Sequence, residues 1–181
     1  MTSPLRVAVV GANGRMGRAV VRLAHEAGMQ VVCAIGRACE GRDAGELAGV
    51  GALGVRVGAE MRAIGGSGAH VVIDFSEPAA LTMAASVCAS AQIALVSGTT
   101  GLDERATLAL ANASATCPVL WEPNMSIGVH VLASLVGRAM TALGSSFDVE
   151  VVEMHHRAKV DAPSGTAIRL GDVVKNARNA R

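Results

Sequence analysis

Residues 5–17 read LRVAVVGANGRMG, and this stretch decides the fold. Its first half is a short apolar run rich in valine, which is typical of a buried strand in a parallel sheet. Glycines follow at three-residue spacing, and an apolar helical pattern then continues to Gly28. A second apolar run at residues 31–35 completes the order strand, glycine turn, helix, strand. This is the βαβ unit that holds a dinucleotide pyrophosphate at the start of its helix.

The glycine turn departs at one position from the usual G-x-G-x-x-G pattern, because position 13 is Asn. Asparagine tolerates left-handed backbone, so the turn can still form at Asn13. Arg15 adds a cation beside the expected phosphates. Glycine-rich turns also serve as plain connectors, but a position directly between a strand and a helix favours a nucleotide site.

The alternation of strand and helix continues along the chain. We predict strands at 71–75, 93–96 and 118–120, helices at about 78–88 and 103–113, a loop at 65–68, and Ser76 as a helix cap. The strands end in polar groups, which are Ser76-Glu77, Thr99-Thr100 and Asn124-Met125-Ser126. Ordinary turn chemistry explains each group singly. Because the carboxyl ends of parallel strands share one edge, we instead expect them to converge with the glycine turn. Residues 1–125 are therefore predicted to form an α/β domain, a Rossmann-type doubly wound parallel sheet.

Composition limits the classes of partner. The net charge is +1, and the aromatic residues are two Phe and one Trp. We therefore expect no nucleic-acid or membrane binding, since neither a strong field nor stacking side chains are present. The four cysteines lack any paired metal-ligand spacing, so we expect no metal site and reduced thiols. A strand begins within a few residues of Met1, and no apolar run reaches the ~18 residues of a membrane span. These features predict a cytoplasmic protein.

Residues 153–167, EMHHRAKVDAPSGTA, hold the densest reactive chemistry in the chain. Two imidazoles stand beside Arg157 and Lys159, just before a predicted helix start. A helix N-terminus offers unpaired N–H groups to a carboxylate, cations add charge, and His transfers protons near neutral pH. The run thus suits a small anionic substrate. The competing interpretation is a solvated charge cluster capped by Asp161 or Ser164.

Taken in order, these motifs carry a resemblance to a known family. The glycine turn, Asp74-Phe75-Ser76, Gly98-Thr99-Thr100-Gly101, the run around Asn124 and the stretch 153–167 resemble the dihydrodipicolinate (4-hydroxy-tetrahydrodipicolinate) reductases. The resemblance extends from residue 5 to about residue 175. It implies the second step of the diaminopimelate branch to lysine. In that step a cyclic imine dicarboxylate, or its hydrated precursor, is reduced with hydride from NADPH or NADH.

The resemblance also implies roles for particular residues. His155 would donate a proton and Lys159 would be the second catalytic residue. The residues expected to hold the substrate are His156, Ser164, Gly165 and Thr166. The residues expected to hold the cofactor are Gly11, Ala12, Asn13, Gly14, Arg15, Met16, Arg37, Gly98, Thr99, Thr100, Glu122, Pro123, Asn124 and Met125. The resemblance also implies that the protein is a homo-oligomer, a tetramer.

Two departures from the family pattern matter. Gly36 stands where an acid often binds the ribose 2′-hydroxyl, and Arg37 suits a 2′-phosphate, which favours NADPH unless Glu40 substitutes. Family members also continue beyond the helix that follows Ser164. We therefore expect residues 126–181 to be a smaller, incomplete α+β substrate domain, linked by a helix at about 126–143. Its strand at 147–154 would lack partners, which predicts low activity for a monomer and self-association.

Two other functions stay open at the level of sequence. One is a nucleotide-binding regulator, or an inactive truncated form of the same fold, against which the intact His155–Lys159 run counts. The other is a different oxidoreductase of this architecture, such as an aspartate dehydrogenase, against which the Lys159–Thr166 run counts.

Overall fold

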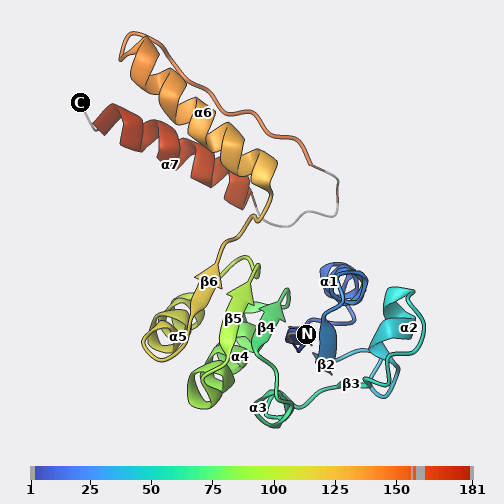
Figure 1. Ribbon diagram of the computed structural model, residues 1–181. Helices are drawn as coiled ribbons and strands as arrows, with labels where there is room; N and C mark the ends of the chain where they lie inside the picture. The colour runs from blue at the N-terminus through green and yellow to red at the C-terminus, as the bar shows by residue number, and fades with distance from the viewer. Residues whose placement is uncertain (1–2, 156, 158–161, 180–181) are drawn as a thin grey trace. The chain divides into compact units, whose positions relative to one another are not determined.

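The computed structural model describes residues 3–155, 157 and 162–179. The chain forms two compact units, Met1–Glu122 and Pro123–Arg181 (Figure 1).

The first unit is built on a parallel sheet of six strands in the order β3-β2-β1-β4-β5-β6. The strands are β1 (Arg6–Val10), β2 (Gln30–Ile35), β3 (Val57–Gly58), β4 (Val71–Asp74), β5 (Ala94–Ser97) and β6 (Val119–Trp121). Every neighbouring pair is parallel, and β1 lies between β2 and β4. This is the Rossmann strand order, with its switch point between β1 and β4. The predicted fold is confirmed.

Helices supply the other faces of two apolar cores. They are α1 (Arg15–Glu26), α2 (Ala44–Ala48), α3 (Ala63–Gly66), α4 (Pro78–Ala91) and α5 (Glu104–Ser114). Val7 and Val9 of β1 join one core with α1 and α2, whereas Ala8 and Val10 join the other with α3, α4 and α5. Side chains alternate across a strand, so a continuous apolar run feeds both faces. This double burial explains why β1 has no polar position after Arg6.

Two local predictions are wrong in this unit. Residues 63–66 form the short helix α3, so part of the loop expected at 65–68 is helical. Ser76 does not cap α4, because Glu77 is the N-cap residue and makes no side-chain capping bond. The Ser76 hydroxyl instead donates to the buried Asp74 carboxylate, which is the stronger, charged acceptor.

In the described part of the second unit, the helices α6 (Ile127–Leu143) and α7 (Gly165–Asn179) pack against each other (Figure 1). Ser126 caps α6 by accepting a hydrogen bond from the Val129 N–H at 3.4 Å, as the predicted linking helix requires. A Cβ atom at Gly137 would lie 3.3 Å from Val173 Cγ1, so glycine allows the two helices to approach closely.

The strand predicted at 147–154 is wrong. No strand occurs in the described part of this unit, and residues 148–155 form no ladder. A strand needs a neighbour for its backbone groups. Here isolated contacts replace the ladder: Arg178 donates to the Phe147 carbonyl at 2.8 Å, and the Ser164 N–H donates to the Glu153 side chain at 2.9 Å. Among the described residues, no helix combines the length and the hydropathy that a membrane span requires.

Candidate functional site

The turn after β1 is a backbone cradle that requires glycine. Gly11 has a φ of +79°, and a Cβ atom there would lie 2.5 Å from the Phe75 carbonyl oxygen. A Cβ atom at Gly17 would overlap the Gly11 carbonyl oxygen, so α1 can start only because this position is bare. The N–H groups of Gly11 and Ala12 both donate to the Ile35 carbonyl at 2.9 Å, which ties the turn to β2.

The start of α1 is suited to an anion. Gly14 is its N-cap residue and makes no side-chain capping bond, so the first amides of the helix are not satisfied by a cap. Such amides, together with the helix dipole, favour a phosphate. Arg15 begins the helix, and the Met16 side chain is exposed beside it. The cradle therefore fits the pyrophosphate of a dinucleotide.

A cavity of about 340 Å³ adjoins this turn at the switch point of the sheet. Its lining comes from the carboxyl ends of β1, β2 and β4, from the residues after β3 and from α4: Val10, Gly11, Asn13, Gly14, Ile35, Gly36, Arg37, Ala38, Ala59, Met61, Phe75, Ser76, Glu77, Ala80 and Met83. Open α/β sheets bind nucleotides at this point. The mainly apolar lining and its size suit an adenosine moiety.

Two residues of this lining bear on the choice of cofactor. A Cβ atom at Gly36 would overlap Asn13 Oδ1, so the Asn13 side chain takes the space beside the missing acid. Arg37 Nη1 lies 2.6 Å from Glu77 Oε1, and both side chains are exposed. Glu40, the alternative acid, lines a separate cavity with residues of β2.

A buried carboxylate lies at the carboxyl end of β4. Asp74 is 0% exposed, and its Oδ2 accepts hydrogen bonds from Ser97 Oγ and Thr99 Oγ1, each at 2.7 Å. Its Oδ1 accepts from the Ser76 hydroxyl. Burial, with Cys117 and Asp74 nearby, raises the pKa of the Cys88 thiol to about 12. A buried charge is stable only when it is hydrogen-bonded, and three hydroxyl donors meet that need.

The same hydroxyl groups also accept hydrogen bonds from backbone N–H groups of two loops. Ser97 Oγ also accepts from the Thr99 N–H at 3.2 Å, and Thr99 Oγ1 accepts from the Ser76 N–H at 3.1 Å. Asp74 therefore fixes the backbones of both the Ser76 and the Thr99 loops. Sequence reasoning missed this role, although an aspartate ending an apolar strand was a signal that could have found it.

The remaining predicted residues of the first unit lie at the same edge of the sheet. The Trp121 indole N–H donates to the Thr99 carbonyl at 2.9 Å, and the Glu122 N–H donates to the Ser97 carbonyl at 3.1 Å. A Cβ atom at Gly98 would overlap the Phe75 ring, so the loop can cross the ring only at a glycine. Thr100 follows on the same loop and is exposed. The structure thus brings the β1, β4, β5 and β6 ends together, as expected for Ser76-Glu77 and Thr99-Thr100, whereas Asn124-Met125-Ser126 belongs to the second unit.

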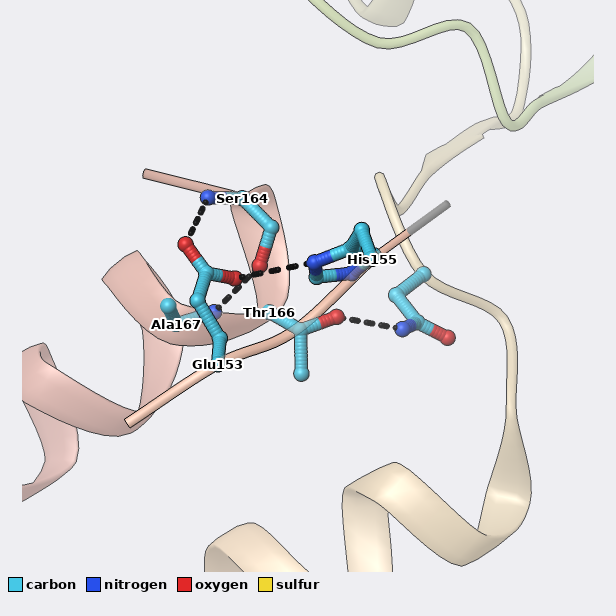
Figure 2. Close-up of polar contacts among 6 residues, drawn as sticks. Glu153, His155, Ser164, Thr166 and Ala167 are labelled. Carbon is cyan, nitrogen blue, oxygen red and sulfur yellow. Dashed lines mark hydrogen bonds and ion pairs between the residues drawn. The ribbon is translucent and has the colours of Figure 1, made fainter. Parts of the chain in front are cut away.

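The second unit holds a separate polar cluster at the start of α7, drawn in Figure 2. Glu153 Oε1 accepts from the Ser164 N–H at 2.9 Å, and Glu153 Oε2 lies 3.6 Å from His155 Nδ1. Ser164 is 3% exposed and caps α7, since its Oγ accepts from the Ala167 N–H at 3.1 Å. The helix start at Gly165 and Thr166 follows directly.

The segment before α6 also reaches this cluster. The Asn124 side-chain amide donates to Thr166 Oγ1 at 2.7 Å, while Asn124 Oδ1 accepts from the Ser126 N–H at 2.9 Å. Pro123 lies in contact range of Gly165, since a Cβ atom there would be 3.8 Å from its ring, and Met125 is 38% exposed. The predicted residues His156 and Lys159 lie outside the described residues.

Known protein families match nearly the whole chain. A family model described as dihydrodipicolinate reductase, N-terminus, matches residues 5–125, and one described as dihydrodipicolinate reductase, C-terminus, matches residues 128–181. The chain belongs to the dihydrodipicolinate reductase family. The matches cover both units, so the glycine cradle and the cluster at α7 belong to one known type of protein.

Curated relatives agree with this membership. Proteins named 4-hydroxy-tetrahydrodipicolinate reductase are 48% identical over 177 residues in Anaeromyxobacter dehalogenans (strain 2CP-C) and 40% identical over 177 residues in Acinetobacter baumannii. These alignments cover 95% and 96% of this chain but 65% and 64% of the relatives. The chain therefore spans about two thirds of their length at most.

A solved structure shows the same architecture. A dihydrodipicolinate reductase from Paenisporosarcina sp. TG-14, with dipicolinate bound, matches with a TM-score of 0.72 at 27% identity. The match covers 99% of this chain and 68% of that chain. The Rossmann-like first unit and the family's C-terminal part are thus both represented here.

Proposed function

We propose that this chain binds NADPH or NADH and acts in the reduction of 4-hydroxy-tetrahydrodipicolinate to tetrahydrodipicolinate, the step of its named relatives. The observation that carries the proposal is the glycine cradle with its adjoining cavity, in a chain whose two units both match this family. Cofactor binding is assigned to residues 1–125 and substrate binding to residues 126–181.

The first unit supplies the cofactor site. The nicotinamide cofactor, when bound, supplies the hydride. Gly11, Ala12, Asn13 and Gly14 form the cradle, and Arg15 and Met16 begin the helix whose amides face the pyrophosphate. The loop of Gly98, Thr99 and Thr100 and the segment from Glu122 to Met125 are assigned to the nicotinamide end, following the family match.

Arg37 favours NADPH over NADH in this proposal. A guanidinium binds a phosphate through two parallel charge-assisted hydrogen bonds. Gly36 offers no acid to the ribose 2′-hydroxyl, and Arg37 is the cation among the described residues that line the cavity.

The second unit supplies the proton and holds the substrate. His155 is assigned as the proton donor, and Nε2 is the nitrogen for the substrate because Nδ1 faces Glu153. The amides of Gly165 and Thr166 at the start of α7 suit one substrate carboxylate. Lys159 as the second catalytic residue, and His156 and Ser164 as substrate-binding residues, follow from the resemblance.

We propose that the protein works as a biosynthetic enzyme. The partner is a small dicarboxylate, consistent with the dipicolinate bound in the Paenisporosarcina protein. We place the protein in the cytoplasm, without nucleic-acid or membrane partners, as a homo-oligomer. A tetramer is the form implied by the resemblance.

The test measures the oxidation of NADPH and of NADH through the loss of the absorbance of the reduced nicotinamide at about 340 nm. The substrate is the freshly made product of dihydrodipicolinate synthase. Turnover that requires this product supports the proposal. Titration calorimetry with each cofactor runs in parallel. A folded chain that binds neither cofactor contradicts the proposal.

A second candidate is nucleotide binding without turnover. The glycine cradle, the cavity and Arg37 all lie within the first unit. Binding of the cofactor is therefore expected not to depend on residues 126–181. Calorimetric binding of NADPH together with no oxidation in the presence of substrate, at every protein concentration, would favour this candidate.

A further inference from the structure

We infer that Glu77 is a specificity-determining residue whose carboxylate competes with a cofactor 2′-phosphate for Arg37 and so limits the preference for NADPH. The inference rests on the proposed cofactor site. It concerns an acidic residue outside the roles given above, at the start of α4 rather than after β2.

The geometry brings the two charges together from different elements at the lining of one cavity. Arg37 follows the end of β2, and Glu77 precedes α4. Both line the 340 Å³ cavity beside the glycine cradle, and Arg37 Nη1 lies 2.6 Å from Glu77 Oε1. The side chains are 71% and 52% exposed, so the ion pair lies at the mouth of the cavity, within reach of an entering nucleotide.

The charges of this cavity decide the direction of the effect. Among its described lining residues, Arg37 is the cation and Glu77 the acid. A 2′-phosphate carries close to two negative charges and binds guanidinium strongly. Glu77 already occupies that guanidinium and repels a second anion placed beside it. NADH carries a neutral 2′-hydroxyl at the same place, and this hydroxyl can donate a hydrogen bond to a carboxylate.

Gly36 explains why an acid from another element of the lining matters. In the usual dinucleotide site an Asp or Glu after the second strand binds the ribose 2′-hydroxyl. Here the Asn13 side chain fills the space of a Cβ at Gly36. Glu77 therefore supplies, from the start of α4, the acidic group that the end of β2 lacks.

A purely structural role predicts a different result. An exposed ion pair contributes little to stability, so loss of the Glu77 charge should leave folding nearly unchanged. The chain offers a matched control: Arg62 Nε lies 3.2 Å from Glu60 Oε2, with both side chains exposed. Glu60 does not line the cavity of Arg37.

The experiment compares the Kd values of NADPH and NADH by titration calorimetry for wild type, Glu77→Gln and Glu60→Gln. We expect Glu77→Gln to bind NADPH roughly five- to twentyfold more tightly, the range expected for removing one nearby like charge at a surface. Binding of NADH should stay equal or weaken by about twofold. The gain for NADPH should shrink between about 0.05 and 0.5 M KCl, because salt screens exposed charges. Glu60→Gln should change neither Kd.

Three results would overturn the inference while leaving the proposed function intact: an unchanged ratio of the two Kd values, weaker NADPH binding in Glu77→Gln, or a gain that is insensitive to salt. Weaker NADPH binding would mean that Glu77 holds Arg37 in position for the phosphate. A wild-type chain that binds neither cofactor would overturn the proposed function and this inference with it.

Discussion

Replacing Asp74 by Asn tests the buried network at the end of β4. The substitution keeps the shape of the side chain but exchanges one carboxylate oxygen for an NH₂ group. Asp74 Oδ2 accepts two hydrogen bonds at 2.7 Å, from Ser97 Oγ and Thr99 Oγ1. These hydroxyl oxygens already accept backbone N–H groups, so their own hydrogens must point to position 74. Either rotamer of Asn places a donor against at least one of these donors or against Ser76.

The magnitude follows from the number of bonds lost. A hydrogen bond to a charged group contributes about 1.5–3 kcal/mol, and Asn loses at least one and at most two. Removing a buried charge offsets part of this loss. We therefore expect Asp74→Asn to lower the free energy of unfolding by about 2–4 kcal/mol, a large share of the ~5–15 kcal/mol of a typical domain.

Urea unfolding, followed by circular dichroism and by tryptophan fluorescence, measures this change. Trp121 donates to the Thr99 carbonyl at 2.9 Å, so its emission reports on the loop that the network holds. Asp103→Asn is the matched control, because Asp103 caps α5 through an oxygen that Asn retains. The control should lose less than about 1 kcal/mol. Equal losses in the two variants, or a loss below about 0.5 kcal/mol for Asp74→Asn, would refute the reasoning.

The other predictions concern catalysis, binding and the core. His155→Gln should lower turnover by ~10²–10⁴-fold with little change in KM; steady-state kinetics showing unchanged turnover in a folded variant would remove His155 from the mechanism. Thr166→Val should raise KM much more than it lowers kcat, since it alters the helix start assigned to the substrate; a pure effect on kcat would contradict that assignment. Arg37→Ala should weaken NADPH binding by roughly 10–100-fold in calorimetry and leave NADH nearly unaffected; equal losses would mean that Arg37 supports the fold. Burial raises the pKa of Cys88 from 9.0 to about 12, so the folded state keeps a proton that the unfolded state loses, and stability should fall as the pH rises above 9 and towards 12. Cys88→Ala should flatten that decline in urea titrations at several pH values, and an unchanged slope would show that other groups cause it.

The first unit could be predicted because its signals are local. The apolar run ending at Val10, the glycines at three-residue spacing and the helical pattern each lie within a few residues. The Gly11 and Gly17 contacts show why no other residue type fits there. Right-handed crossovers keep most consecutive strands adjacent, but β3 and β4 lie three positions apart, because there the chain crosses to the other side of β1.

The strand predicted at 147–154 shows where local signals end. Its alternation of valines with polar residues is typical of a strand, yet no ladder forms in the described part of the second unit. A strand depends on backbone partners from elsewhere in a structure, and a single segment does not specify them.

The sequence by itself therefore determined the sheet, the glycine cradle and the family, and it named the candidate residues for the cofactor and substrate sites. Only the tertiary structure decided which of these residues meet. Asp74 joins hydroxyls up to 25 positions away, and Arg37 meets Glu77 at the lining of the cavity. Such contacts arise because parallel strands bring distant loops to one edge of a sheet. The distances and charges at that edge, rather than any motif, fix how the loops are held.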